Sequence, residues 1–381
     1  MTMKMERNKL LIFIVTLLCL LVGLGACSGI ETENHESGEV GSICITVAGD
    51  AVSTKAVTDN LAGETNIKDV QVLIFKSDDG ALYRKVDLGA GSGGTLSAEI
   101  TNVNVGSYTV AAYVNGLAAG SNVKSIKTLD ALQKTGVALS FNKPGSDGSF
   151  IMYGEKSGVT VTKGAQAAAK VDVTRLVSRI RLLSVKNGIP AAYGKLTVNR
   201  VCVINGKGMW KLNNGSPSAN FAWAGRKWNK SESTDAADFI TAAADMTYTT
   251  GSTTYQFGEL TFAEKGVEIA NAATNTAGFG DAFYVFPNST ASDVGKASFQ
   301  GPLAYSSAAC TRLMLTATVN GTVYYYPVTV PAMKRNESYD VSLTISGFGS
   351  TDPNKEPEKG SIKVTVTVNP WSGGQEINAD L

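Results

Sequence analysis

Few side chains in this 381-residue sequence have the type and spacing that acid–base, nucleophilic or metal chemistry needs. The chain has one histidine, His35, so every triad, dyad or metal centre that needs two histidines is excluded. Asp78 and Asp79 could act as a carboxylate pair for acid–base work or bind calcium. No further acids follow at ligand spacing, and Gly80 closes the run, so we interpret the pair as a turn. The sequence therefore predicts no catalytic site, no metal site, no cofactor and no enzymatic activity.

Gly89, Gly91 and Gly94 match the G-x-G-x-x-G spacing of dinucleotide-binding loops. Such a loop must lead into a helix whose N-terminus faces the pyrophosphate. The residues from Thr95 to Ile100 are typical of a strand instead. We therefore predict a flexible hairpin loop at these glycines.

The start of the chain carries the most specific local signal. Three basic residues precede an apolar segment, Leu10 to Leu24, that is too short to remain as a membrane span. The segment ends in Leu-Gly-Ala-Cys27, the pattern of a bacterial lipobox. The resemblance to a lipobox implies cleavage before Cys27, acylation of its thiol with a lipid such as palmitate, and anchoring in the outer membrane. An ordinary secretory signal with an incidental Cys27 is the alternative.

Three further cysteines, Cys44, Cys202 and Cys310, follow Cys27. An odd number excludes a complete disulfide framework. A Cys202–Cys310 disulfide stays open, although buried thiols are the favoured interpretation.

Three tryptophans, Trp210, Trp223 and Trp228, lie in a polar, loop-rich stretch and could stack on sugar rings. Packing beneath a long loop is the favoured interpretation. A surface glycan-binding lipoprotein therefore stays open as an alternative function.

Composition narrows the class of protein further. The chain has 34 basic and 33 acidic side chains, and this near-zero balance argues against nucleic acid as a partner. With 43% hydrophobic and 18% charged residues, the chain can bury ordinary cores, and its length suggests two domains.

Short β-rich runs separated by glycine-rich turns cover most of the sequence, which predicts an all-β fold of β-sandwiches. Asn320-Gly321 is a strong two-residue hairpin signal. Residues 126–133 and 233–244 could hold short helices. The expected strands lie at 69–76, 82–88, 96–105, 107–114, 159–173, 312–319, 322–330 and 338–346.

An amphipathic strand is expected at 41–47, near the start of the mature chain. Its alternation places Ile43, Ile45 and Val47 on one face.

A stretch of small and polar residues follows this strand, and such loops are where proteases cut. Lys55 is its only basic residue before Lys68. A trypsin-like protease cutting between Lys55 and Ala56 would release the first strand and open an unpaired sheet edge. A plain surface lysine is the alternative.

A second amphipathic strand, 361–368, follows the proline-rich linker 350–360. One face carries four aliphatic side chains, and Trp371 lies just beyond: Ile362, Val364, Val366 and Val368. A detachable strand of this kind can complete its own sheet or fill a groove in another molecule.

Three features together resemble the fimbrillins of Bacteroidales, the type V pilins. These are the lipobox, the run Val173 to Ile180 and the C-terminal run from Tyr339 to Pro357 with its following strand. The resemblance implies two transthyretin-like β-sandwich domains in tandem and export as a lipoprotein. It also implies proteolytic loss of the first strand, followed by insertion of a neighbour's C-terminal strand.

Carried to this sequence, the resemblance assigns 41–47 as the removable strand, Lys55–Ala56 as the cut and 361–381 as the donor. One difference is the cut itself, because the oral members are cut after arginine. Lys55 would require another protease of trypsin-like specificity.

The expected division of the chain has five parts. They are a lipoprotein signal peptide at 1–26, a tether with the removable strand at 27–55, an N-terminal sandwich at 56–180, a C-terminal sandwich at 181–349, and a linker with the donor strand at 350–381.

These expectations favour a structural pilin subunit of a surface fimbria. Its partners would be copies of itself, other fimbrial subunits, the protease, and receptors on host or bacterial surfaces. An anchor or tip adhesin subunit is the alternative within the family, since an anchor would keep its lipid and a tip would lack the donor.

Overall fold

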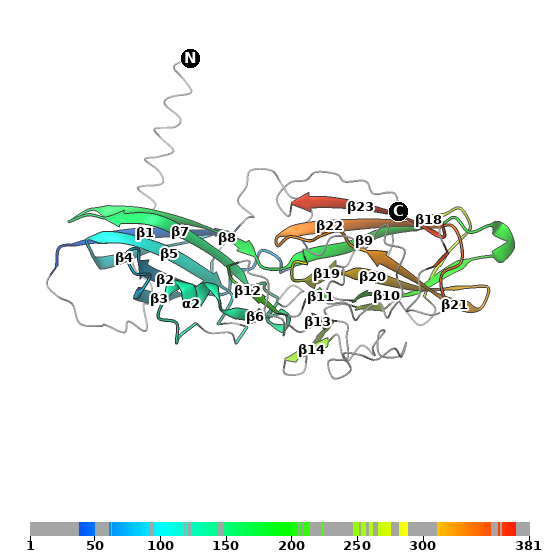
Figure 1. Ribbon diagram of the computed structural model, residues 1–381, viewed down its shortest axis with the longest axis horizontal. Helices are drawn as coiled ribbons and strands as arrows, with labels where there is room; N and C mark the ends of the chain where they lie inside the picture. The colour runs from blue at the N-terminus through cyan, green and yellow to red at the C-terminus, as the bar shows by residue number, and fades with distance from the viewer. Residues whose placement is uncertain are drawn as a thin grey trace, which may run out of the picture. The chain divides into compact units, whose positions relative to one another are not determined.

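Strands make up nearly all of the regular structure in the computed structural model of this chain (Figure 1). The residues that the structure describes are 38–49, 61, 63–91, 95–117, 119–120, 123–142, 148–204, 206–207, 209–213, 223–224, 247–250, 253–256, 259–261, 266–275, 282–288, 311–351, 357–358 and 360–370.

The first large sheet has seven strands in the order β3-β2-β5-β7-β8-β1-β4. Their bounds are β1 (Val40–Gly49), β2 (Val70–Lys76), β3 (Leu82–Leu88), β4 (Thr95–Asn104), β5 (Gly106–Val114), β7 (Met152–Val161) and β8 (Gln166–Arg175). Strand β1 is an inner strand, parallel to β8 on one side and antiparallel to β4 on the other.

Two five-stranded sheets follow, one in the order β16-β10-β20-β21 with β17 on β10, the other in the order β18-β9-β22-β23 with β19 on β9. Their bounds are β9 (Ser178–Asn187), β10 (Leu196–Ile204), β16 (Glu259–Thr261), β17 (Val267–Ile269), β18 (Thr274–Asn275), β19 (Ala282–Val285), β20 (Arg312–Val319), β21 (Thr322–Thr329), β22 (Glu337–Ile345) and β23 (Ile362–Pro370). Strands β22 and β23 lie side by side, orange and red in Figure 1.

The remaining elements are short. They are α2 (Leu129–Gln133), β6 (Gly136–Ala138), β11 (Gly206–Lys207), β12 (Met209–Lys211), β13 (Trp223–Ala224), β14 (Thr247–Thr250), β15 (Thr253–Gln256) and the 3₁₀ turns η2 (Leu139–Phe141) and η3 (Ala191–Tyr193). The pairs β11–β13, β12–β6 and β14–β15 each form a two-stranded sheet.

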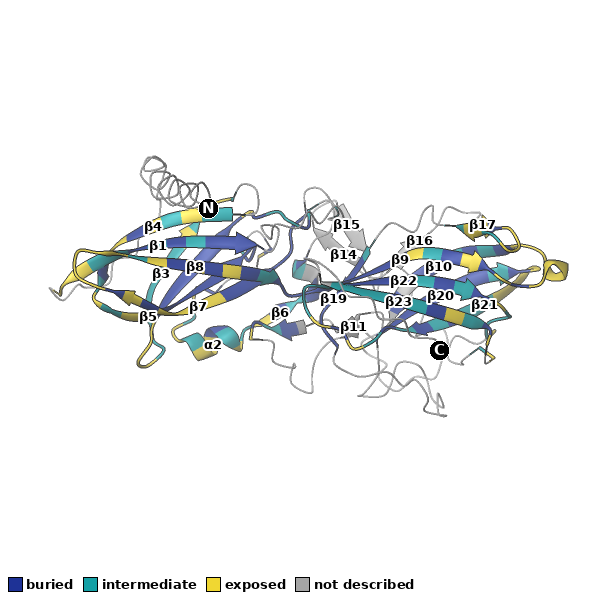
Figure 2. Cartoon of the chain, turned by 90° about the horizontal axis from the view of Figure 1, so that it is seen from above, coloured by how far each residue is buried: buried dark blue, intermediate teal, exposed yellow. Residues whose placement is uncertain are grey.

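Three hydrophobic cores hold these sheets together. One face of the seven-stranded sheet, including Ile43 and Val171, encloses the first core. The opposite face of β2, β5 and β7 packs with β12 and β19 around Phe150. The two five-stranded sheets enclose the third core, which includes Val341. Buried residues appear in dark blue along β1, β8 and β22 in Figure 2.

Local predictions from the sequence are confirmed in two places. Asn320 (φ 48°) and Gly321 (φ 78°) form the tight turn of the β20–β21 hairpin, because both positions require the left-handed region. Helix α2 lies within the expected 126–133, and its N-cap Thr128 accepts a hydrogen bond from the Ala131 amide. The second expected helix, 233–244, lies outside the described residues.

The prediction of a hairpin at Gly89 to Gly94 is wrong. Strand β4 does follow, as expected, but β3 and β4 stand at opposite ends of the sheet order and do not pair. The segment therefore connects the two ends of one sheet, because tertiary pairing and not chain proximity chose the partners of each strand.

The change from the first sheet to the next occurs between Arg175 and Ser178, so the expected boundary at residue 180 falls within β9. The described residues from Glu39 onward belong to one compact unit. A division into two domains accordingly stays a prediction.

Several predicted features lie outside the described residues: the signal segment 1–26, Cys27, Lys55, Ala56, Trp228, Cys310 and Trp371. Within the described part of the chain, no helix has the length and apolar character needed to cross a membrane.

Candidate functional site

The strand predicted to be removable is an inner strand of the first sheet. Ile43, Ile45 and Val47 on β1 are each 0% exposed and face the first core, as the alternation predicted. Each residue of the strand's middle has neighbours on both sides; Ile45, for example, is paired with Ala98 of β4 and Ala169 of β8. Strand β1 thus supplies both a ladder to two strands and part of a core.

The beginning of β1 lies tightly against the β7–β8 turn. A Cβ on Gly41 would be 2.5 Å from the carbonyl oxygen of Thr162 and 2.6 Å from that of Ala165, so only glycine fits there. The Ser42 amide donates to the Ala165 carbonyl at 3.0 Å, and the Gly164 amide donates to Val40 at 2.8 Å.

Loss of β1 would therefore have a different consequence from the one expected. The sequence predicted that its removal would expose one sheet edge, but β1 separates β8 from β4. Its removal leaves an opening with an unpaired strand on each side, and the backbone groups of both strands would require a new partner.

Strand β4 has a second attachment besides β1. From β3, Arg84 donates to the carbonyls of Thr101 (Nη1, 2.7 Å) and Asn102 (Nη2, 2.8 Å). The Asn104 amide donates to the Tyr83 hydroxyl at 3.0 Å. Side chains of β3, at one end of the strand order, therefore bind the backbone of β4, at the other end. These contacts hold β4 independently of β1.

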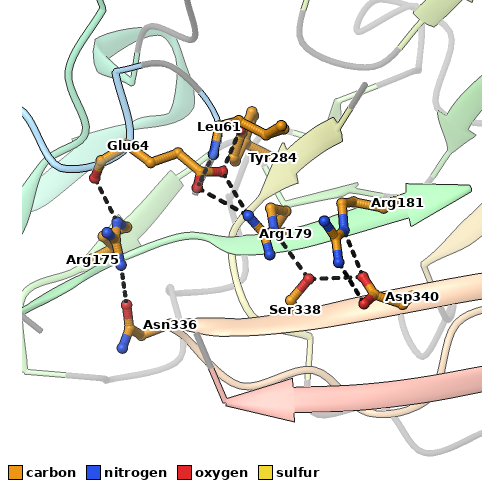
Figure 3. Close-up of polar contacts among 9 residues, drawn as sticks. All are labelled: Leu61, Glu64, Arg175, Arg179, Arg181, Tyr284, Asn336, Ser338 and Asp340. Carbon is orange, nitrogen blue, oxygen red and sulfur yellow. Dashed lines mark hydrogen bonds and ion pairs between the residues drawn. The ribbon is translucent and has the colours of Figure 1, made fainter. Parts of the chain in front are cut away.

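A buried polar network surrounds Glu64, which follows the segment containing the predicted cut (Figure 3). The Glu64 carboxylate accepts from Arg179 Nη1 at 2.9 and 3.1 Å, from the Tyr284 hydroxyl at 2.7 Å and from the Leu61 amide at 2.9 Å. Arg175 Nε donates to the Glu64 carbonyl at 2.8 Å. Side chains from β8, β9 and β19 therefore fix this segment.

Burial raises the pKa of Tyr284 well above its ordinary value, and the neighbouring Glu64 carboxylate adds to the effect. Tyr284 therefore stays protonated and continues to donate its hydrogen bond to Glu64 throughout the physiological range.

The network continues from β9 across β22 to β23 (Figure 3 draws it as far as Asp340). Arg179 Nε donates to the Ser338 hydroxyl at 2.9 Å, and Ser338 donates to Asp340 Oδ1 at 3.0 Å. Arg181 holds Asp340 with two bonds, Nε to Oδ1 at 2.8 Å and Nη2 to Oδ2 at 2.6 Å. Asn369 on β23 donates to Asp340 Oδ2 at 2.9 Å.

The predicted donor strand is docked on its own chain in this structure. Strand β23 pairs antiparallel with β22 along its whole length, with Val366 opposite Val341. Val364 and Val366 are buried and Ile362 and Val368 are half-buried, all against the third core. The predicted alternation of the strand is confirmed, and it forms the outer strand of its sheet.

The structure does not bring the two predicted strand sites together, because β1 and β23 belong to different sheets. Sequence reasoning missed the Glu64 network entirely. Its one available signal was the run from Val173, which carries arginines at 175, 179 and 181 in a segment that ends one strand and begins the next.

Two side interpretations of the sequence are also decided. Trp210 is 6% exposed on β12 and stacks on Phe286, so it packs into the second core and cannot serve as a sugar platform. The Asp78–Asp79 turn is confirmed, since Asp79 Oδ1 accepts from the Ala81 amide at 2.8 Å. Cys44 is half-buried on β1.

Among the described residues, no three His, Cys, Asp or Glu side chains gather in a way that could hold a metal ion. The features with functional potential are a buried inner strand near the start of the chain and an amphipathic outer strand near its end.

Comparison with solved structures defines the class of fold. The structure is similar to the fimbrilin FimA of Porphyromonas gingivalis W83 (TM-score 0.56, 14% identity, 88% of this chain and 99% of that one). It is also similar to candidate cell adhesion proteins of Bacteroides eggerthii (TM-score 0.54, 19% identity, 89% and 98%) and Parabacteroides distasonis (0.54, 16%, 87% and 99%). At these identities the likeness establishes the fold, an all-β arrangement of the fimbrillin type.

Sequence comparison finds a family model that matches part of the chain. Residues 41–187 match the model of the major fimbrial subunit protein (FimA) family. The predicted resemblance to Bacteroidales fimbrillins is confirmed by this match and by the structural neighbours. No curated protein sequence matches the chain.

Proposed function

We propose that this chain is a structural subunit of a cell-surface fimbria that polymerises by donor-strand exchange. The observation that carries the proposal is the FimA-family match over 41–187, which spans β1 and both strands that enclose it. An inner strand followed by the polar stretch around Lys55 is a suitable substrate for removal by a protease.

The proposed route begins with export and lipid attachment at Cys27, which holds the precursor in the outer membrane. A trypsin-like protease then cuts between Lys55 and Ala56. The tether and β1 leave, and the opening between β8 and β4 receives residues 361–381 of another copy. The aliphatic face of that donor takes the places of Ile43, Ile45 and Val47.

Energetics favour cutting before exchange. Burying an aliphatic side chain contributes about 1.5–3 kcal/mol, and ordering each residue costs about 1–2 kcal/mol. Strand β1 buries three aliphatic side chains and the donor would bury four. The difference in free energy between the two is too small for the donor to displace β1 from the sheet. Once β1 is gone, the unpaired backbone of β4 and β8 adds its own drive toward a new strand.

Within this proposal, the chain forms two transthyretin-like sandwich domains in tandem, divided at the connection between Arg175 and Ser178, and the protein has no enzymatic activity. Its partners are copies of itself and other fimbrial subunits at the cell surface. An anchor subunit, which keeps its lipid and is not cut, remains distinguishable by experiment.

Limited trypsin digestion of the folded precursor tests the proposal. We expect a cut after Lys55 and conversion of monomers into SDS-resistant ladders. Lys55→Ala should abolish the ladders, whereas Lys68→Ala, at the next basic residue, should leave them intact. Ladders that persist in Lys55→Ala would show the cut to be wrong, and a cut without ladders would favour the anchor.

A chain that lacks residues 361–381 tests the donor. It should remain a folded monomer that accepts a donor but offers none, so mixing it with cut full-length protein should shorten the ladders. Collapse of the truncated chain would instead show that this strand is an essential part of its own sheet.

A further inference from the structure

We propose that Asp340 on β22 is a positioning residue that holds β23 on its own sheet through Asn369 until the strand is exchanged. The proposal rests on the proposed function for the role of β23 as donor. The contact itself is a property of the single chain and can be measured without assembly.

The Asp340 carboxylate is buried, with its side chain 5% exposed, and it accepts hydrogen bonds from three residues. Arg181 on β9 and Ser338 on β22 belong to strands that stay with the subunit. Of these donors, Asn369 alone lies on β23. Strand β23 is therefore attached to the Asp340 carboxylate by one hydrogen bond, near the C-terminal end of the strand.

Because only one of the three residues that bind Asp340 lies on β23, the strand can leave and return without leaving the Asp340 charge uncompensated. Removing the counter-ion of a buried carboxylate is strongly unfavourable. When β23 leaves, however, Asp340 keeps its two bonds from Arg181 and its bond from Ser338. The charge of Asp340 stays compensated, and at this carboxylate the departure of β23 breaks one charge-assisted hydrogen bond instead of an ion pair.

The rest of the network keeps Asp340 in position. Ser338 accepts from Arg179, whose guanidinium is held by the Glu64 carboxylate (Figure 3). Because these residues lie on parts of the chain that neither the cut nor the exchange removes, the carboxylate is fixed and ready to bind Asn369 again.

Hydrogen exchange of the full-length, uncut chain tests the contact. A hydrogen bond to a charged group is strong enough that its loss should open β23 about tenfold more often. We expect Asn369→Ala to raise exchange of the β23 amides about tenfold, with β9 and β20 unchanged. Asn369→Asp, which places a second carboxylate beside Asp340, should raise it further.

Thr365→Ala is the matched control, because Thr365 lies on the same face of β23, is half-buried and pairs with the uncharged Ser342. It should leave the exchange of β23 near that of the original chain. Unchanged exchange in both Asn369 variants, or an equal rise in Thr365→Ala, would overturn the proposal.

Trypsin treatment of the same variants separates this inference from the proposed function. If β23 is the donor, Asn369→Ala should also form ladders several-fold faster than the original chain. Faster amide hydrogen exchange in Asn369→Ala, with no ladders in any variant, would support the Asp340 contact and contradict polymerisation by donor-strand exchange. Ladders at the original rate together with unchanged exchange would sink the Asp340 contact and leave the proposed function standing.

Discussion

Glu64 and Arg179 form a buried ion pair, with Arg179 Nη1 2.9 Å from Glu64 Oε2, although they are 115 residues apart in the chain. The pair joins the segment before β2 to β9. Because Glu64 follows the proposed cut, it would stay with the processed subunit and fix the new N-terminal segment. The ion pair therefore ties the segment that follows the proposed cut to β9.

Removal of the Glu64 carboxylate should strongly destabilise the fold. Loss of one partner from a buried ion pair costs about 3–5 kcal/mol, since the remaining charge stays buried. We expect Glu64→Ala to lower the free energy of unfolding by this amount in urea titrations. Glu39→Ala is the control, because the Glu39–Lys163 pair is exposed and should cost less than about 1 kcal/mol. Equal losses in the two variants would contradict a special role for Glu64.

Truncation of a core side chain on β1 should loosen that strand. Ile45→Ala removes a fully buried side chain and leaves a cavity that costs about 2–5 kcal/mol. We expect lower stability and faster trypsin cleavage after Lys55. Thr46→Ala, on the opposite face, loses a 3.2 Å contact with Ser97 and should change both quantities little. Cleavage at the same rate in both variants would show that β1 docking does not protect the loop.

Arg84 should matter more after β1 has left than before. In the intact chain β4 is held by both β1 and the Arg84 bonds to the Thr101 and Asn102 carbonyls. After the cut, the backbone of β4 keeps these two bonds and the bonds of Asn104 with the Tyr83 and Tyr108 hydroxyls. We expect Arg84→Ala to change the stability of the precursor by about 1 kcal/mol and to slow ladder formation severely.

Lys85→Ala, at the next position on β3, provides the comparison, because Lys85 contacts Asp87 and not β4. It should leave ladder formation unchanged. If Arg84→Ala destabilises the uncut precursor as much as it destabilises the cut form, β1 contributes little to holding β4 in place.

Sequence periodicity predicted the faces of β1 and β23 and the Asn320–Gly321 hairpin, because side-chain alternation and turn chemistry are local properties. Sequence periodicity could not predict the order of the strands, because nothing near β1 in the sequence indicates that its parallel partner is β8. The Glu64–Arg179 pair was equally hidden, since a lone glutamate in a polar segment has no spacing signal. The hairpin predicted at Gly89 to Gly94 failed for the same reason, as the partners of β3 and β4 are set by tertiary packing.

Trp210 should act in folding and not in recognition. It is buried in the second core against Phe286, and truncation of a buried tryptophan costs about 3–5 kcal/mol. We expect Trp210→Ala to lower the urea midpoint without any glycan-dependent signal on an array in either form. If the original chain binds glycans and Trp210→Ala removes that binding without lowering stability, the alternative function of a glycan-binding lipoprotein would be favoured.

Alkaline pH should weaken the third core through Tyr326. Burial raises the pKa of Tyr326 from 10.0 to about 12, and its hydroxyl donates to the Gly347 carbonyl at 3.1 Å. As the pH rises, the Tyr326 hydroxyl loses its proton at a lower pH in the unfolded chain than in the folded chain. The contribution of the protonated hydroxyl to the free energy of unfolding is therefore complete below pH 10 and is lost as the pH rises from 10 toward 12. A shift of this size corresponds to stability on the order of 2–3 kcal/mol. We expect Tyr326→Phe to cost about 1 kcal/mol at pH 7 and to flatten the fall in unfolding free energy between pH 10 and 12. An unchanged slope in that window would show that the Tyr326 hydroxyl is not what the alkaline transition titrates.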